Sequence, residues 1–180
     1  FIKENPGIIL SLVLVVFIPA AIFFNTFYTV GLFEKNIDII THEKAILAEN
    51  IINQTARGIF SNPEELSKLV ADVTARNDDV RLFEILAPTE KSESFRILSS
   101  NNVESIGKEA TDFKNVLAWS REEGIATLVG TESERFWNVT KSVRNEAGEK
   151  LGLVSLSFSL ATADALVNRS INRSYIVLFF

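Results

Sequence analysis

The apolar residues of this chain are concentrated near its start. Residues 7–33 read GIILSLVLVVFIPAAIFFNTFYTVGLF and contain no charged side chain. A helix of this length spans roughly 40 Å, more than the roughly 30 Å hydrocarbon core of a bilayer, and membrane helices tolerate a proline such as Pro19. The alternative is a cleaved signal peptide, but its apolar core is shorter, about 7–15 residues, and no small-residue cleavage site follows. We therefore expect a transmembrane helix over residues 7–33.

A second apolar segment, residues 175–180 (YIVLFF), closes the sequence. Residues 161–174 before it have helical character, and a tyrosine followed by aliphatic residues suits the interfacial start of a membrane helix. We expect residues 161–180 to form an output helix and the truncated start of a second transmembrane helix. A buried strand end is the alternative interpretation. Because the sequence has no methionine, we also expect it to be an internal piece of a longer protein.

The residues between these segments have the pattern of one soluble domain. Residues 34–60 continue as a helix with an apolar stripe, and Ser61-Asn62-Pro63 ends it. Pro63 and the two acidic residues after it open a short helix to about Arg76. The stripe of the long helix comprises Ile37, Ile40, Leu47, Ile51 and Ile59, widened by Ala45, Ile46, Ile52 and Ala56.

Strand-like segments dominate the rest of this domain. A helix capped by Thr111 is expected to run to about Glu123, with Phe113, Val116 and Leu117 on its buried stripe. Gly124 ends this helix. The strands are expected at residues 80–87, 94–100, 125–130, 135–144 and 150–160.

The last two strands form a hairpin whose register can be predicted. If Asn145 pairs with Lys150, the loop is residues 146–149, with Gly148 free to adopt a positive φ. One face is then apolar, with Trp137 opposite Phe158 and Val139 opposite Leu156. The other face is polar, with Asn138 opposite Ser157 and Thr140 opposite Ser155. A one-residue slip would mix the two sets, so the pattern supports this register.

Composition excludes several function classes. The chain has no cysteine and one histidine, which argues against thiolate metal sites and cysteine or histidine-rich catalytic centres. Its net charge of −5 argues against a nucleic-acid partner. Nucleophile-elbow, zinc and paired-acid motifs do not stand out, so a membrane-anchored hydrolase is the least favoured function. We expect no cofactor, no metal and no enzymatic activity in this segment.

Three segments resemble the single Cache (PAS-like) extracytoplasmic sensor domains of bacterial receptors, chiefly sensor histidine kinases. They are the long helix leaving a membrane span, the stretch VRLFEILAP…FRILSSNNVESIG, and RFWNVTKSVRNEAGEKLGLVSLSFSL before the second span. The resemblance covers residues 34–174. It implies an α+β fold in which a five-stranded antiparallel sheet carries the long helix on one face. It also implies small-ligand binding on the other face, and a homodimer formed through the long helix.

The polar face of the hairpin is the first candidate ligand site. If the apolar face covers the long helix, the polar face carries donors and acceptors for a small polar or anionic ligand. An open, solvated sheet face is the alternative. Trp119 could be a pocket wall or a dimer contact, and Arg121 and Arg96 could neutralise an anion, although each is by default a surface residue. The hairpin candidates are Phe136, Asn138, Thr140, Ser142, Ser155 and Ser157.

Two other groups have weaker functional interpretations. The acidic residues Glu64, Glu65, Asp72, Asp78 and Asp79 could bind a divalent cation, but their spread along the sequence favours a solvated face. His42 is expected to be an exposed helix residue.

The sequence thus predicts a ligand-sensing input domain, extracytoplasmic in a bacterial membrane and in contact with the lipid bilayer. A ligand that binds Ser155 or Ser157 would shift the last strand, which leads directly into the output helix. The full-length output is expected to be a histidine kinase, with a chemoreceptor or a diguanylate cyclase as alternatives. The rival function is a membrane-anchored protein-interaction module without a small ligand.

Overall fold

The structure is a computed structural model that describes residues 6–91, 93–131 and 134–179. The chain divides into two compact units. One unit is formed by residues 40–162 and contains the sheet. The other is formed by the helical segments that precede and follow it, and each unit is described by itself.

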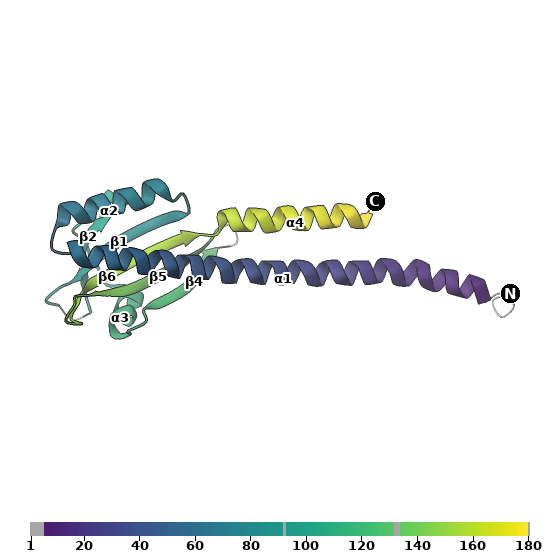
Figure 1. The fold of residues 1–180 in the computed structure, drawn as a ribbon, viewed down its shortest axis with the longest axis horizontal. Helices are drawn as coiled ribbons and strands as arrows, with labels where there is room; N and C mark the ends of the chain where they lie inside the picture. The colour runs from purple at the N-terminus through teal and green to yellow at the C-terminus, as the bar shows by residue number, and fades with distance from the viewer. Residues whose placement is uncertain (1–5, 92, 132–133, 180) are drawn as a thin grey trace. The chain divides into compact units, whose positions relative to one another are not determined.

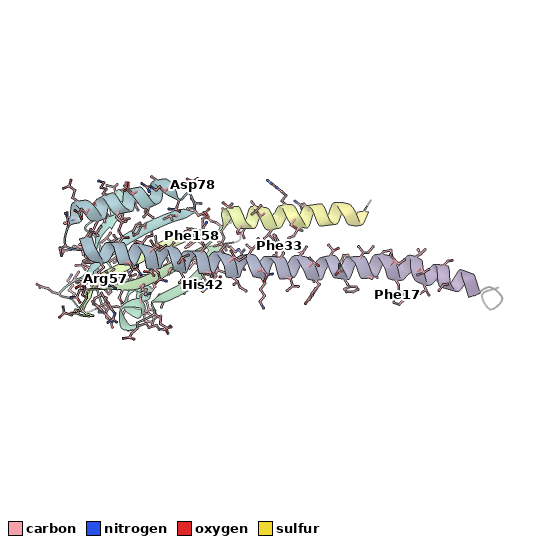
Figure 2. The ribbon with its side chains drawn as sticks, in the orientation of Figure 1. Phe17, Phe33, His42, Arg57, Asp78 and Phe158 are labelled. Atoms are coloured by element: carbon pink, nitrogen blue, oxygen red, sulfur yellow. The ribbon has the colours of Figure 1, made fainter. Side chains whose placement is uncertain are left out.

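The helical unit contains most of α1 (Pro6–Ile59) and of α4 (Ala161–Phe179). The expected membrane segment is helical and exposed: Phe17 is 68% exposed, and Figure 2 shows it projecting from α1 together with Phe33. Among the described residues, α1 is the one helix long and apolar enough to cross a membrane, with a mean hydropathy of 2.3 over its most apolar window. The second transmembrane helix falls on α4 and on Phe180, which lies outside the described residues, and it stays a prediction.

The sheet domain is α+β, as expected, but the described part of its antiparallel sheet has six strands instead of five. The strand order is β3-β2-β1-β6-β5-β4 (Figure 1). The missed strand is β3, a two-residue edge strand that pairs with Phe95 and Arg96. The strands are β1 (Val80–Pro88), β2 (Phe95–Ser100), β3 (Glu109–Ala110), β4 (Ile125–Thr131), β5 (Glu134–Arg144) and β6 (Lys150–Ser159), and a short 3₁₀ helix, η1, spans Val103–Ser105.

The register of the β5–β6 hairpin is confirmed along most of its length. Trp137 pairs with Phe158, and Thr140 pairs with Ser155. Gly148 has a φ of +83°, as the turn requires. The pairing nearest the turn was wrong, because a bulge after Val143 places Arg144, not Asn145, opposite Lys150.

Helices α1 and α2 (Pro63–Arg76) cover one face of the sheet. Ala45, Ile52 and Ala56 of α1 form one core with Leu66 and Val70 of α2. The sheet contributes Phe83, Ile85, Val139, Val143, Val154, Leu156 and Phe158 to this core, and Trp137 packs against it. The apolar face of the hairpin therefore covers the long helix, as predicted.

The buried stripe of α1 differs from the one the sequence indicated. Ile40, Leu47 and Ile51 are 62%, 62% and 58% exposed, whereas the small residues Ala45 and Ala56 are buried. Small side chains let the helix approach the sheet closely, and the larger aliphatic residues are left on the outer face. These exposed aliphatic side chains form an apolar surface that the other described residues leave uncovered.

Helix α3 (Phe113–Ser120) lies on the opposite face of the sheet. Asp112 caps it instead of the expected Thr111, accepting a hydrogen bond from the Lys114 N–H at 3.1 Å. Phe113 is 74% exposed, so its expected place in the buried stripe was wrong, and the buried positions are Asn115 and Ala118. Ala118 joins a second core with Leu86, Phe95, Ile97, Ile125 and Leu153.

Candidate ligand-binding site

The polar side chains of the hairpin form a buried row on the face of the sheet opposite α1. Successive strand residues point to opposite faces, so Asn138 and Thr140 alternate with Val139, which belongs to the α1-facing core. All five polar residues are buried, with exposed fractions from 0% at Thr140 to 6% at Ser157; they are Asn138, Thr140, Ser142, Ser155 and Ser157. These side chains are therefore not part of an open, solvated sheet face.

Hydrogen bonds join four of these residues into a chain with a direction. Thr140 Oγ1 donates to Asn138 Oδ1 at 3.3 Å and lies 3.0 Å from Ser155 Oγ. Either hydroxyl can donate in the second of these bonds, because each carries one proton. Asn138 Nδ2 in turn donates to Ser157 Oγ at 3.2 Å. Ser155 Oγ therefore keeps at least one lone pair for a further contact, and Ser157, which accepts from Asn138, keeps its proton.

Glu84 extends the row onto the neighbouring strand β1. It is the cross-strand partner of Ser155, and such partners have Cβ atoms about 4.5–5.5 Å apart on the same face. Burial raises the pKa of the Glu84 carboxyl above its ordinary value; the positive charge of Lys114 opposes this shift and the negative charge of Asp112 adds to it. The sequence analysis missed Glu84, because a charged residue in a strand is usually on a solvated face.

Two buried oxygen atoms on this side of the sheet lack hydrogen-bond partners in the described structure: Asn115 Oδ1 on α3 and Ser142 Oγ on β5. Asn115 is only 2% exposed, and α3 packs against β5 and β6, the strands that carry the polar row. A buried polar atom without a hydrogen bond costs about 1–3 kcal/mol, a cost that a bound ligand, ion or water removes when it supplies the bond. Asn115 could not be recognised from the sequence, because it is one polar residue in a short helix.

The remaining candidates are less closely tied to the row. Phe136 is half-buried on β5 and, by alternation, shares the face of Asn138. Trp119 packs on the second core, with its ring 5.6 Å from that of Phe95 and under the Lys150 ammonium at 5.2 Å. Arg121 is exposed at the C-terminus of α3.

Arg96 belongs to a separate groove of about 530 Å³ at the β1–β2 hairpin. Lys91 and Glu109 also line this groove and form an ion pair of 2.9 Å across it. The hydrogen bond from Lys91 lowers the pKa of the Glu109 carboxyl. The two arginines expected to neutralise an anion are therefore not brought together with the polar row.

The described residues contain no group of three His, Cys, Asp or Glu side chains that could hold a metal ion. Among the acidic residues considered for a cation site, Asp79 forms an ion pair with Lys44 and accepts a hydrogen bond from Thr162. His42 is half-buried, with its ring 4.5 Å from that of Trp137, so its expected exposure was wrong.

A second polar cluster lies between α1 and β5. The Asn53 side-chain amide donates to Glu49 Oε1 at 3.1 Å and to the Ser142 carbonyl at 3.2 Å. Lys141 donates to Asn50 Oδ1 at 2.6 Å. Burial raises the pKa of Glu49 to about 7, partly offset by the Asn53 hydrogen bond and the positive charge of Lys141. This cluster meets β5 at Ser142, whose side chain is on the opposite face.

Comparison with known proteins identifies the fold. Neither a family model nor a curated protein sequence matches the chain. Among solved structures, it is similar to the ligand-binding domain of the Pseudomonas aeruginosa PAO1 amino acid chemoreceptor PctC, in complex with GABA. The TM-score is 0.55 at 18% identity, over 75% of this chain and 64% of that one. The fold is that of bacterial receptor sensor domains.

Two further structures share the sensor-domain fold. The periplasmic domain of RsbU from Chlamydia trachomatis matches with a TM-score of 0.51 and 14% identity, over 79% of this chain and 56% of that one. The Escherichia coli DcuS sensor domain matches with a TM-score of 0.50 and 15% identity, over 74% of this chain and 98% of that one. The chain thus spans the whole length of the DcuS domain but only 56% and 64% of the RsbU and PctC domains.

Proposed function

We propose that this chain is the ligand-sensing input region of a bacterial membrane receptor. In this proposal α1 anchors the chain in the cell membrane and residues 40–162 form the extracytoplasmic sensor. The sensor-domain fold and the apolar, exposed residues of α1 support it. The output is a histidine kinase, with a chemoreceptor or a diguanylate cyclase as the alternatives, because structures of the same fold belong to several receptor types.

The buried polar row carries the proposal. Thr140, Ser155, Asn138 and Ser157 are hydrogen-bonded to one another on the face away from α1. A buried polar row in the middle of a sheet costs desolvation energy that an aliphatic row would avoid. The unpaired Asn115 Oδ1 beneath α3 adds to that cost. A bound ligand that completes these hydrogen bonds would offset part of that cost.

The same observation weakens the rival function. A protein-interaction module that used this sheet face would present it to solvent, yet the polar side chains are at most 6% exposed. A small ligand held against the sheet is compatible with that burial.

The proposed route of the signal begins at β6. Ser155 and Ser157 lie on this strand, and only Leu160 separates the strand from α4. Ser159 Oγ accepts a hydrogen bond from the N–H of Ala161 at 3.1 Å, so the start of α4 is bonded back to the end of β6. A ligand that favours one position of β6 would change the position of the first turn of α4.

We further propose that the receptor is a homodimer joined by the outer face of α1. Ile40, Leu47 and Ile51 recur at intervals of seven and four residues, so they lie along one stripe, and each is more than half exposed. The variant Leu47→Arg should convert a dimer of the whole chain in nanodiscs to a monomer in light scattering. Ser67→Arg, at an exposed polar residue of α2 outside this stripe, is its control. A wild-type chain that is monomeric contradicts this proposal.

The ligand site can be tested by a thermal-shift screen. The whole chain in nanodiscs would be scanned against a library of small metabolites, with Trp137 and Trp119 as intrinsic fluorophores. A ligand should raise the melting temperature, by about RT ln(1 + [L]/Kd) in free energy. The variant Ser157→Ala should weaken that shift because it removes a hydroxyl of the row.

Ser67→Ala is the matched control, because Ser67 is an exposed serine on α2, which covers the other face of the sheet. It should leave the ligand-induced shift unchanged. A screen in which no compound shifts the melting temperature, or in which Ser157→Ala and Ser67→Ala behave alike, contradicts the proposed site.

A further inference from the structure

The hydrogen-bonded row runs from Ser155 through Thr140 and Asn138 to Ser157. Its two ends, Ser155 and Ser157, differ in the hydrogen-bonding groups that remain free. At the Ser155 end, the Ser155 hydroxyl bonds to Thr140, and its oxygen keeps at least one lone pair that can accept, whichever hydroxyl donates. Its cross-strand neighbour Glu84 is a carboxylate, which only accepts when ionised. At the Ser157 end, the Ser157 proton and the second N–H of Asn138 remain available to donate.

The unpaired oxygen on α3 is a further acceptor. Asn115 Oδ1 is buried and receives no hydrogen bond from any described group. The helix that carries Asn115, α3, packs on β5 and β6. Lys114 and Asp112, at the start of this helix, are close enough to shift the pKa of Glu84, Lys114 downwards and Asp112 upwards. The oxygens of Glu84, Ser155 and Asn115 thus belong to one side of the sheet, and within the described residues Asn115 Oδ1 receives no hydrogen bond.

The charges near this end are negative in sum. Glu84 and Asp112 contribute two carboxylates, and Lys114 contributes one ammonium group, which pairs with Asp112 at 3.4 Å. Arg96 and Arg121, which an anionic ligand would need, are exposed elsewhere. A negative local charge with unused acceptors stabilises a bound cation and repels a carboxylate.

We infer that the Ser155 end of the row binds the ammonium group of a small organic amine, with Glu84 as counter-ion and Ser155 and Asn115 as acceptors. This inference rests on the proposed function, because it takes the polar row to be the ligand site. An oxygen of the same ligand, two or three bonds from the amine, accepts from Ser157 or Asn138. The ligand is thus a primary amine with a hydroxyl or carbonyl group, which agrees with the small polar ligand of the sequence-based expectation and not with its anionic alternative.

The test compares amines with carboxylates of the same skeleton. The whole chain, ¹⁵N-labelled and in detergent micelles at pH 7, is titrated with propylamine and ethanolamine, and separately with butyrate and 3-hydroxypropionate. The side-chain amide signals of Asn115 and Asn138 report binding at the row. Both amines should shift these signals at lower concentrations than their carboxylate counterparts, and ethanolamine should bind more tightly than propylamine.

The variant Glu84→Gln keeps the shape of the side chain and removes its charge. It should weaken binding of both amines by about tenfold or more, since a hydrogen bond to a charged group is among the stronger ones. Glu90→Gln, at an exposed carboxylate in the β1–β2 turn, should leave amine binding unchanged.

The remaining outcomes overturn the inference in separable ways. Tighter binding of the carboxylates at the same two amides overturns the ammonium assignment and leaves the proposed ligand site standing. Amine binding that Glu84→Gln does not change also overturns it. If none of the four compounds moves either amide, the inference fails, and the metabolite screen decides the proposed function independently.

Discussion

Lys44 Nζ lies 3.0 Å from Asp79 Oδ2, and this ion pair joins α1 to the residue that precedes β1. Asp79 Oδ1 also accepts a hydrogen bond from Thr162 Oγ1 at 3.2 Å, and its backbone carbonyl accepts the N–H of Ser159 at 2.7 Å. One aspartate therefore bonds both the segment that enters the sheet domain and the segment that leaves it.

Asp79→Ala should increase local opening at the start of α4 and change the unfolding free energy of the domain only slightly. The ion pair is partly exposed, so its loss should cost no more than about 1 kcal/mol in the free energy of unfolding. Backbone amide exchange at residues 160–163 should accelerate, because Thr162 loses its acceptor. The control is Asp78→Ala at the exposed neighbouring aspartate, and equal exchange in both variants would contradict the expected role of Asp79.

The buried Glu49 should make the domain less stable as the pH rises. Its pKa is about 7 in the folded protein against 4.5 as the ordinary value, so between these pH values the folded state binds more protons than the unfolded state. The contribution of Glu49 to the free energy of unfolding is therefore fully present below about pH 4.5, and it is lost as the pH rises towards 7.

The variant Glu49→Gln removes this dependence while keeping the oxygen that accepts from Asn53. At pH 8 it should be more stable than the wild type, by up to about 3 kcal/mol at 1.36 kcal/mol per pKa unit. At pH 4.5 the two should be nearly equal. Urea unfolding followed by tryptophan fluorescence measures both, and Glu43→Gln at an exposed position of α1 should follow the wild type. A pH-independent difference would contradict the assigned cause.

Thr140 holds the polar row together in the absence of ligand. Thr140→Val keeps its shape and leaves Asn138 Oδ1 and Ser155 Oγ without their shared partner, so it should cost about 1–3 kcal/mol of unfolding free energy. Thr127→Val, at an exposed threonine of β4, should change stability by less than about 0.5 kcal/mol. Similar unfolding midpoints for the two variants would show that the row contributes little.

Gly152 is required by the close approach of β6, β1 and the end of α1. A Cβ atom there would collide with the Leu86 carbonyl and with the Phe60 ring. Gly152→Ala should therefore cost about 1–3 kcal/mol or more, as overpacking of a core does. Gly58→Ala, in α1 with open space around it, should instead stabilise by up to about 1 kcal/mol. Thermal unfolding of both variants would show opposite shifts if this packing is correct.

Much of the fold could be predicted from local pattern. The alternation of apolar and hydroxyl residues determines the β5–β6 register, because any odd slip would bury the wrong set. Pro63 and Asn62 mark the start of α2, since a proline and a capping amide are both favourable there. These features depend only on residues close in sequence.

The rest depends on long-range contacts. Strand β3 consists of Glu109 and Ala110, which carry no strand pattern and are extended only because β2 is beside them. The burial of Ala45 instead of Leu47 depends on how closely α1 lies on the sheet, which hydrophobicity does not reveal. Glu84 and Asn115 were missed for the same reason: their importance comes from the neighbours that the fold gives them.

Strand β6 has serine side chains on one face and apolar side chains on the other, and this alternation limits how the strand can move. Its odd-numbered serines face α3 and its even-numbered aliphatic residues face α1, so sliding by one residue would put Ser155 among leucines and Leu156 against Glu84. Such a slide is unfavourable, because several side chains would leave the surroundings in which they are now buried at the same time. Any mechanical response of the domain must therefore be a tilt or a bend of less than one residue spacing, with the neighbouring strands β1 and β5 carried along.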